Sequence, residues 1–191
     1  MLKPLNKFSL FSIKTGLLGV STLLFSTFIS LEVPKANAVK LTNGKTAFEH
    51  PPSLIRSATS NGMRNNNYAT YQFTLKVPEN ATETLKAVKI EQINTPRIIK
   101  FNQKKISAFF GDSFAGGEKL SLAAVGGNFQ PGSVTVVFNK PVNPGETVTV
   151  SLEPRSNPSI SGVYLFGITA YPVGENSNGI YVGTGRIHIS N

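Results

Sequence analysis

The stretch that most constrains this chain is Gly162–Pro172, GVYLFGITAYP, an uncharged run that is too short to cross a membrane. Its β-branched and aromatic residues, closed by Pro172 and Gly174, favour a strand over a helix. Strand side chains alternate between two faces, here Val163, Leu165 and Thr169 against Tyr164, Phe166, Ile168 and Ala170. Because both sets are largely apolar, the run predicts a central strand covered on both faces, with Phe166 in the core between two sheets. Gly167 predicts a bulge or the close approach of another backbone.

The first 38 residues have the pattern of a secretory signal peptide. Lys3, Lys7 and Lys14 form a basic start, an apolar stretch follows over Thr15–Ile29, and Ala36-Asn37-Ala38 supplies the small residues of a cleavage site. The apolar stretch is shorter than the ~20 residues that a spanning helix needs. We therefore expect an exported protein, periplasmic, envelope-bound or extracellular, that is cleaved after Ala38 and then has no membrane span.

The charge and the absence of cysteine limit the classes of partner and the kinds of metal site that this chain can have. Residues 39–191 hold 15 Lys and Arg against 9 Asp and Glu, a net charge of +6. The basic residues are scattered singly, whereas a nucleic-acid site normally clusters them. We expect no nucleic-acid partner, and a solvated basic surface with some attraction for anionic envelope polymers or lipid surfaces. The absence of cysteine excludes disulfides and thiolate metal sites, so stability must come from the core.

Short alternating segments follow one another from Tyr68 to the end of the chain. Strands are predicted at 71–77, 88–92, 97–101, 104–110, 120–122, 134–138, 148–152, 162–172 and 180–190, with Pro, Gly and Asn turns between them. This pattern predicts an all-β fold, an antiparallel β-sandwich of about eight strands, Ig-like or jelly-roll-like, with a β-barrel as the alternative. Residues 39–67 are sparse in apolar side chains and are expected as an extended lead-in. The domain is then 68–191, and we expect a monomer.

Catalytic and metal sites find little support in the sequence. Only His50 and His188 are available, and neither lies in a nucleophile-elbow pattern. Two histidines without cysteine do not suggest a zinc site, and no stretch resembles a calcium-binding loop. The carboxylates are dispersed, but a glycosidase pair can come from distant positions, so a hydrolase remains the alternative. We predict no catalytic residue, no metal and no cofactor.

Aromatic side chains are the best candidates for ligand binding. Three tyrosines lie in or beside predicted strands, where they either pack in the core or line a groove for a sugar or peptide. Three phenylalanines form the densest aromatic cluster, and its position beside the Gly-rich loop 111–127 makes this cluster a candidate lip of a cleft. The six candidates are Tyr164, Tyr171, Tyr181, Phe109, Phe110 and Phe114.

Four phrases of the sequence resemble one family: PPSL at 51–54, YATYQFTL at 68–75, VPENA at 77–81 and GVYLFGITAYP at 162–172. The chain resembles the exported cyanobacterial family catalogued as a domain of unknown function, number 2808 in that series, over nearly all of the sequence after the signal. The resemblance implies an envelope or secreted location in a photosynthetic bacterium. It brings no known activity and no catalytic residues.

Two functional classes therefore remain. The first is a non-enzymatic envelope module that binds an envelope polysaccharide, an envelope protein or itself, and the second is a hydrolase of envelope glycan. The missing histidine-based machinery and the neutral Thr and Ser faces of the strands favour recognition over reaction. Two carboxyl groups facing one another across a cleft, at about 5 to 9.5 Å, would favour the hydrolase.

Overall fold

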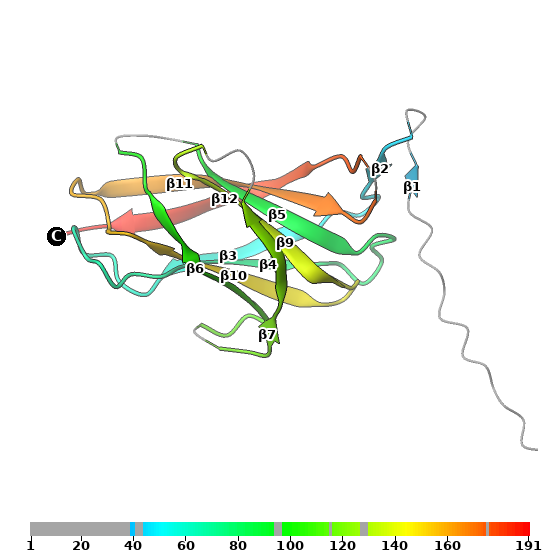
Figure 1. The fold of residues 1–191 in the computed structure, drawn as a ribbon, viewed down its shortest axis with the longest axis horizontal. Helices are drawn as coiled ribbons and strands as arrows, with labels where there is room; N and C mark the ends of the chain where they lie inside the picture. Colours follow the sequence, from blue (N-terminus) through cyan, green and yellow to red (C-terminus); the bar gives the residue numbers. More distant parts are fainter. Residues whose placement is uncertain (1–38, 41–43, 94–96, 115, 127–129, 175) are drawn as a thin grey trace, which may run out of the picture. The chain divides into compact units, whose positions relative to one another are not determined.

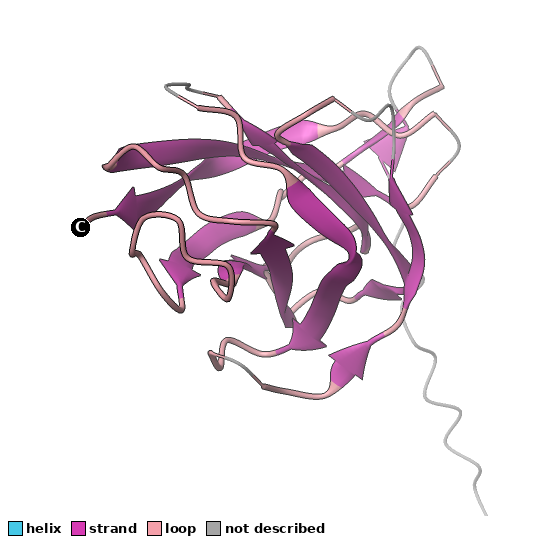
Figure 2. Ribbon diagram, turned by 60° about the vertical axis from the view of Figure 1, so that its left-hand side comes forward, coloured by secondary structure: helices cyan, strands magenta, loops and turns pink. Residues whose placement is uncertain are grey.

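The computed structural model describes residues 39–40, 44–93, 97–114, 116–126, 130–174 and 176–191. These residues form strands, turns and loops without a helix, as Figure 1 and Figure 2 show. Accordingly, no helix that could span a membrane occurs in this part of the chain.

Two five-stranded sheets pack face to face. The first has the order β3 (Ser53–Thr59), β4 (Tyr71–Lys76), β10 (Thr147–Pro154), β6 (Phe101–Phe110) and β7 (Lys119–Leu120). The second has the order β12 (Ile180–Ile189), β11 (Gly162–Pro172), β5 (Leu85–Gln92), β9 (Ser133–Val142) and β8 (Leu122–Gly126). Two short strands, β1 (Val39–Lys40) and β2 (Thr46–Ala47), pair separately, and all these pairings are antiparallel. The predicted sandwich is confirmed, and the barrel is wrong because the two sheets are separate.

Three predictions for strands need correction. The predicted strand 120–122 is divided between the sheets, because β7 ends at Leu120 in the first sheet and β8 begins at Leu122 in the second. The segment 39–67, expected as a lead-in, contains β3, which pairs with β4 and forms one edge of the first sheet. A register shift between Leu54 and Arg56 breaks the alternation of β3, so the sequence pattern gave no strand signal there. The predicted strands 97–101 and 104–110 form a single strand, β6, and residues 97–100 precede it as a loop.

As expected, a Pro-Gly pair forms the turn before each of two predicted strands, Pro131-Gly132 before β9 and Pro144-Gly145 before β10. At Gln130-Pro131-Gly132-Ser133 the Ser133 amide donates to the Gln130 carbonyl at 2.9 Å, and Gly132 has a φ of 83°. Proline at the second position and a positive φ at the third are the signature of a type II turn. This turn starts β9 and places its first residues beside the groove described below.

Four aromatic rings hold the two sheets together. Phe166 of β11 contacts Phe73 at a centroid distance of 5.4 Å, Tyr71 at 6.0 Å and Phe101 at 6.2 Å. Tyr71 and Phe73 belong to β4 and Phe101 to β6, so one side chain of the second sheet meets two strands of the first. The predicted core position of Phe166, which is fully buried, is confirmed.

The opposite face of β11 differs from the prediction. β11 is an interior strand, paired with β12 and β5, but Val163 on its outer face is 41% exposed. A strand that is hydrogen-bonded to a neighbour along each of its two edges can still expose one face to solvent. The prediction that both faces of this strand are covered is therefore wrong. An added Cβ at Gly167 would lie 3.0 Å from the Ile93 Cγ2 and 3.2 Å from the Tyr181 Cε2. The close neighbours of Gly167 on this face are therefore side chains.

The two lateral edges of the sandwich are built differently. At one edge β3 meets β12, where the Arg186 amide donates to the Ser57 Oγ at 2.9 Å. An added Cβ at Gly185 would lie 2.7 Å from the Phe73 ring, so glycine lets β12 approach the core closely. We call this the sealed edge. At the other edge, which we call the open edge, the chain passes from β7 to β8 through Ser121 alone, and a hollow lies between β6 and the β8–β9 pair.

Candidate functional site

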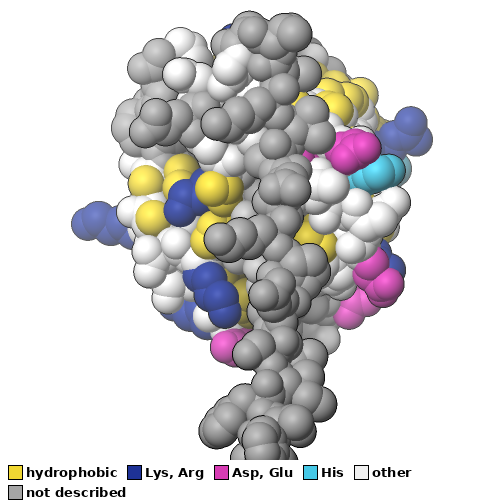
Figure 3. All heavy atoms as spheres, turned by 90° about the vertical axis from the view of Figure 1, so that its right-hand side faces the viewer, with side chains coloured by type: hydrophobic (Ala, Val, Ile, Leu, Met, Phe, Trp, Pro, Cys, Tyr) yellow, Lys and Arg dark blue, Asp and Glu magenta, His cyan; other side chains and the backbone are white. Residues whose placement is uncertain are grey.

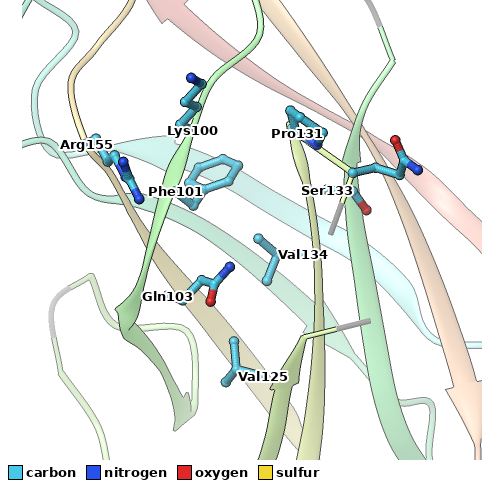
Figure 4. Close-up of a pocket in the computed structure, with 10 residues that line it drawn as sticks. Lys100, Phe101, Gln103, Val125, Pro131, Ser133, Val134 and Arg155 are labelled. Atoms are coloured by element: carbon cyan, nitrogen blue, oxygen red, sulfur yellow. The ribbon is translucent and has the colours of Figure 1, made fainter. Parts of the chain in front are cut away.

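A groove of about 290 Å³ opens between β6 of the first sheet and the β8–β9 pair of the second. We call it the edge groove. Its wall on β6 includes Phe101 and Gln103, and its wall on the second sheet includes Val125, Pro131 and Val134. In Figure 4 the Phe101 ring and the Val134 and Val125 side chains point into the space between the strands. The floor is therefore apolar, and through Phe101 it is continuous with the four-ring core.

Polar and basic side chains surround this apolar floor. The amide of Gln103 points into the groove, and Lys100 and Arg155 lie at one end of it (Figure 4). The Arg155 amide donates to the Lys100 carbonyl at 2.8 Å, which fixes the two segments side by side. An apolar floor with a few convergent polar groups is the usual composition of a ligand site.

An irregularity in β6 positions Gln103. Along the pair of β6 with β10 the register shifts, so that Pro154 faces Phe101 while Leu152 faces Ile106. The four residues between Phe101 and Ile106 therefore bulge out of the regular ladder, and three of them are exposed. Lys105 in this bulge forms an ion pair of 2.8 Å with Glu153, and Gln103 is the residue of the bulge that lines the groove.

The predicted tyrosines occupy three different environments. Tyr164 is fully buried and donates a hydrogen bond of 2.8 Å to the Ile160 carbonyl, so it belongs to the core and lines no groove. Burial raises its pKa, partly opposed by the charge of Arg97. Tyr171 is half-buried with its ring beside Gly179, and Tyr181 is 56% exposed on the outer face of β12. The three side chains therefore do not converge on one site.

The predicted phenylalanine cluster also separates. Phe109 and Phe110 are consecutive in β6 and point to opposite faces, and Phe110 packs against the core. Phe114 is 41% exposed, with the Arg56 guanidinium 5.9 Å from its ring centroid. None of the three lines the edge groove. The predicted cluster therefore does not form a lip of the edge groove.

Acidic and metal-binding groups contribute little to the described surface. Among the described residues no group of three or more His, Cys, Asp and Glu side chains could hold a metal ion. The described residues that line the edge groove include no carboxylate and no histidine. On the face that Figure 3 shows, basic and acidic side chains are scattered among neutral ones rather than gathered by sign.

Sequence reasoning missed the residues that line the edge groove. Lys100 and Phe101 were read as part of a short strand, and Val125 as part of a Gly-rich loop. The groove brings together chain positions from 100 to 155, which only the sheet order places side by side. One signal was available: Phe101 is the only apolar residue between Lys100 and the polar run 102–105, which is where β6 bulges.

The fold and the groove define a β-sandwich domain with a candidate binding site at its open edge. The chain belongs to the family described as "Protein of unknown function (DUF2808)", whose model matches residues 45–189. A search of curated proteins finds no match.

Solved structures with a weak likeness to this chain include domains of bacterial surface proteins. The collagen-binding domain of a Staphylococcus aureus adhesin is 6% identical, with 73% of this chain and 99% of that chain covered and a TM-score of 0.40. The collagen-binding subdomain of the Enterococcus faecalis surface protein ACE is 9% identical, with 69% and 92% covered and a TM-score of 0.43. AvmM, which catalyses a macrocyclization in alchivemycin A biosynthesis, is 8% identical, with 81% and 96% covered and a TM-score of 0.36. We transfer no function from these likenesses.

Proposed function

We propose that this protein is an exported, non-enzymatic binding module of the cell envelope that holds an extended polymer in the edge groove. The observation that carries the proposal is the composition of the groove, an apolar floor of Phe101, Val125 and Val134 beside the Gln103 amide and two cations. Such a surface can pack against the apolar face of a ligand while its amide and cations orient polar groups.

A hydrolase is the second candidate, and the groove argues against it. Glycoside hydrolysis normally requires two carboxyl groups about 5 to 9.5 Å apart on either side of the scissile bond. The described residues that line the edge groove supply neither carboxylate. We therefore assign this surface to recognition.

Export rests on the amino-terminal sequence. Residues 1–38 lie outside the described part of the chain, so cleavage after Ala38 remains a prediction from the basic start, the short apolar stretch and the A-x-A ending. Intact-mass measurement of the protein recovered from its host tests this. We expect a chain that begins at Val39, and a full-length product bound to the membrane would contradict the prediction.

Groove binding is tested by filling the groove without changing charge. Val125 and Ala124 are neighbours in β8, but Val125 lines the groove and Ala124 does not. The purified protein is sedimented with peptidoglycan sacculi, and is tested for binding to purified envelope polysaccharides. We expect Val125→Phe to weaken binding about tenfold or more, because the ring occupies the ligand's place, and Ala124→Phe to bind like the parent. Equal affinities of the two variants would remove the edge groove from the proposal.

A further inference from the structure

A second hollow of about 280 Å³ lies next to the edge groove and shares Lys100 and Arg155 with it. We call it the cationic cleft. Arg97 is its third basic residue, and Asn65, Ser156 and Ser159 are among the polar residues that line it. The two hollows are therefore adjacent, and the shared cations stand between them. An extended ligand that lies in the edge groove would reach the cationic cleft next.

The segment that carries Arg97 and Lys100 is held in place by one glutamine. The Gln92 Nε2 donates to the Arg97 carbonyl at 2.9 Å, and the Gln92 Oε1 accepts from the Ile99 amide at 2.9 Å. The backbone amide of Gln92 also donates to the Gly132 carbonyl at 2.8 Å, in the turn that starts β9. Gln92 thus ties the cationic segment to the wall of the edge groove.

The opposite wall of the cleft is fixed by a buried asparagine. The Asn157 Oδ1 accepts from the Tyr71 hydroxyl at 2.8 Å, and its Nδ2 donates to the carbonyls of Asn61 and Met63 at 2.9 and 2.8 Å. Its backbone amide donates to the Asn66 carbonyl at 2.7 Å. Because both polar atoms of the Asn157 side chain have hydrogen-bond partners, the segment 155–159 is a rigid support for Arg155. Rigid supports lower the entropy cost of ligand binding.

The three cations have no acidic partner in the described part of the chain. The ion pairs found there join Lys89 to Glu91 and Lys105 to Glu153. No carboxylate is among the described residues that line the cationic cleft. A cleft that gathers three exposed cations around neutral hydroxyl and amide groups attracts an anion, because nearby acids do not cancel the field.

We propose that the edge groove and the cationic cleft together recognise an acidic polysaccharide, whose carboxylate or sulfate groups meet Arg97, Lys100 and Arg155. This inference rests on the proposed function and names the ligand class of the same site. The apolar floor of the edge groove accepts the C–H face of a neighbouring sugar ring, and Gln103, Asn65 and the two serines supply partners for its hydroxyls.

The shape of the site favours a glycan over the other polyanions. A lipid surface is contacted by basic residues on a protruding part of a protein, whereas Arg97, Lys100 and Arg155 line a hollow. Single-stranded nucleic acid binds along stacked aromatic platforms, and the only aromatic ring among the described residues lining either hollow is Phe101, which is largely buried in the core. Each exposed ion pair contributes little by itself, so affinity must come from several charges along one polymer.

The test measures binding of the purified protein to oligomannuronate by titration calorimetry, with cello-oligosaccharide of equal length as the neutral comparison. The triple variant Arg97→Gln, Lys100→Gln and Arg155→Gln removes the proposed contacts. Its matched control is Lys76→Gln, Lys104→Gln and Lys140→Gln, which removes the same charge from exposed residues that line neither hollow. The variant Gln92→Ala keeps all three cations but removes the side-chain hydrogen bonds that hold the segment carrying Arg97 and Lys100.

We expect the first triple variant to bind oligomannuronate roughly tenfold to a hundredfold more weakly, and the control triple to bind like the parent. Gln92→Ala should show an intermediate loss, and added salt should weaken the parent more than the first triple variant. Equal losses in both triple variants would overturn the inference, because they would show attraction by net charge alone. Binding to phosphatidylglycerol vesicles but not to oligomannuronate would also overturn it, in favour of a lipid surface.

The two proposals fail in distinguishable ways. Binding of the neutral oligosaccharide or of sacculi that Val125→Phe abolishes, with no preference for oligomannuronate, would overturn the acidic ligand and keep the groove. Oligomannuronate binding that the first triple variant abolishes and Val125→Phe leaves intact would confine the ligand to the cationic cleft and overturn the edge groove. No binding to any of these probes would count against both proposals.

Discussion

The two lateral edges of this sandwich differ, because the sheets are hydrogen-bonded to one another at the sealed edge and border a groove at the open edge. At the sealed edge Gly185 lets β12 approach the Phe73 ring, and Ser57 links the two sheets by hydrogen bonds with the Arg186 backbone. At the open edge β6 bulges, and a groove lies between it and the β8–β9 pair. The difference teaches that a sandwich can be joined through its aromatic core and one closely packed edge while its other edge carries a groove.

The largest effect is expected at the core that both edges share. Phe166→Ala removes the ring that contacts Tyr71, Phe73 and Phe101, and should lower the free energy of unfolding by about 3 to 5 kcal/mol. Val163→Ala on the exposed face of the same strand should cost less than about 1 kcal/mol. Chemical denaturation measures both. A parent-like Phe166→Ala would show that the four-ring cluster does not join the sheets.

The sealed edge should be the more sensitive to added volume. Gly185→Ala places a methyl group 2.7 Å from the buried Phe73 ring and 3.1 Å from the Ser57 Cβ, and should cost about 1 to 3 kcal/mol. Gly116→Ala is the control, because an added Cβ there meets nothing within 4 Å. Thermal unfolding compares them, and equal melting temperatures would mean that the sealed edge is looser than described.

Alkaline pH should loosen the core beneath the cationic cleft. Burial raises the pKa of Tyr71, with a further contribution from Tyr164, and burial likewise raises the pKa of Tyr164. The unfolded chain ionises these phenols near pH 10, and burial keeps the Tyr71 phenol protonated in the folded state above that pH. The stability that Tyr71 contributes is therefore fully present below about pH 10 and falls above it, by up to about 1.4 kcal/mol per pH unit. Denaturation at several pH values should give a shallower fall for Tyr71→Phe, and parallel curves would refute the assignment.

A smaller effect is expected from one buried hydroxyl. Tyr164→Phe removes the hydrogen bond to the Ile160 carbonyl and should cost about 1 kcal/mol, without a change in ligand binding. Urea denaturation and the sedimentation assay measure the two quantities. A variant that unfolds like the parent but binds less would return Tyr164 to the list of ligand-binding residues.

The smallest change in stability is expected at the open edge. Gln103→Ala removes an exposed side chain and should alter the free energy of unfolding by less than about 0.5 kcal/mol while weakening ligand binding. Ser57→Ala at the sealed edge should do the reverse, because it loses about 1 kcal/mol of hydrogen bonding and touches neither hollow. Loss of binding in Ser57→Ala alone would reverse the functional assignment of the two edges.

The sequence by itself determined the strands whose alternation is regular. β11 runs from Gly162 to Pro172 as predicted, and its pairing with β12 shifts register between Ile168 and Thr169, where Ile168 faces Gly183. These features depend on local properties, namely β-branched residues, prolines that end pairing and glycines that admit a bulge. The core position of Phe166 followed for the same reason.

Only the tertiary structure decided which strands are neighbours and where the groove between the two sheets lies. The sequence of β3 lacks a regular alternation because this edge strand contains a bulge. The outer face of β11 carries apolar residues, although Val163 on that face is exposed. The site residues Phe101, Val125 and Arg155 lie far apart in the sequence and meet through the order of the sheets. Long-range pairing sets that order through the packing of whole sheets, so a local pattern predicts the strands and not the groove between them.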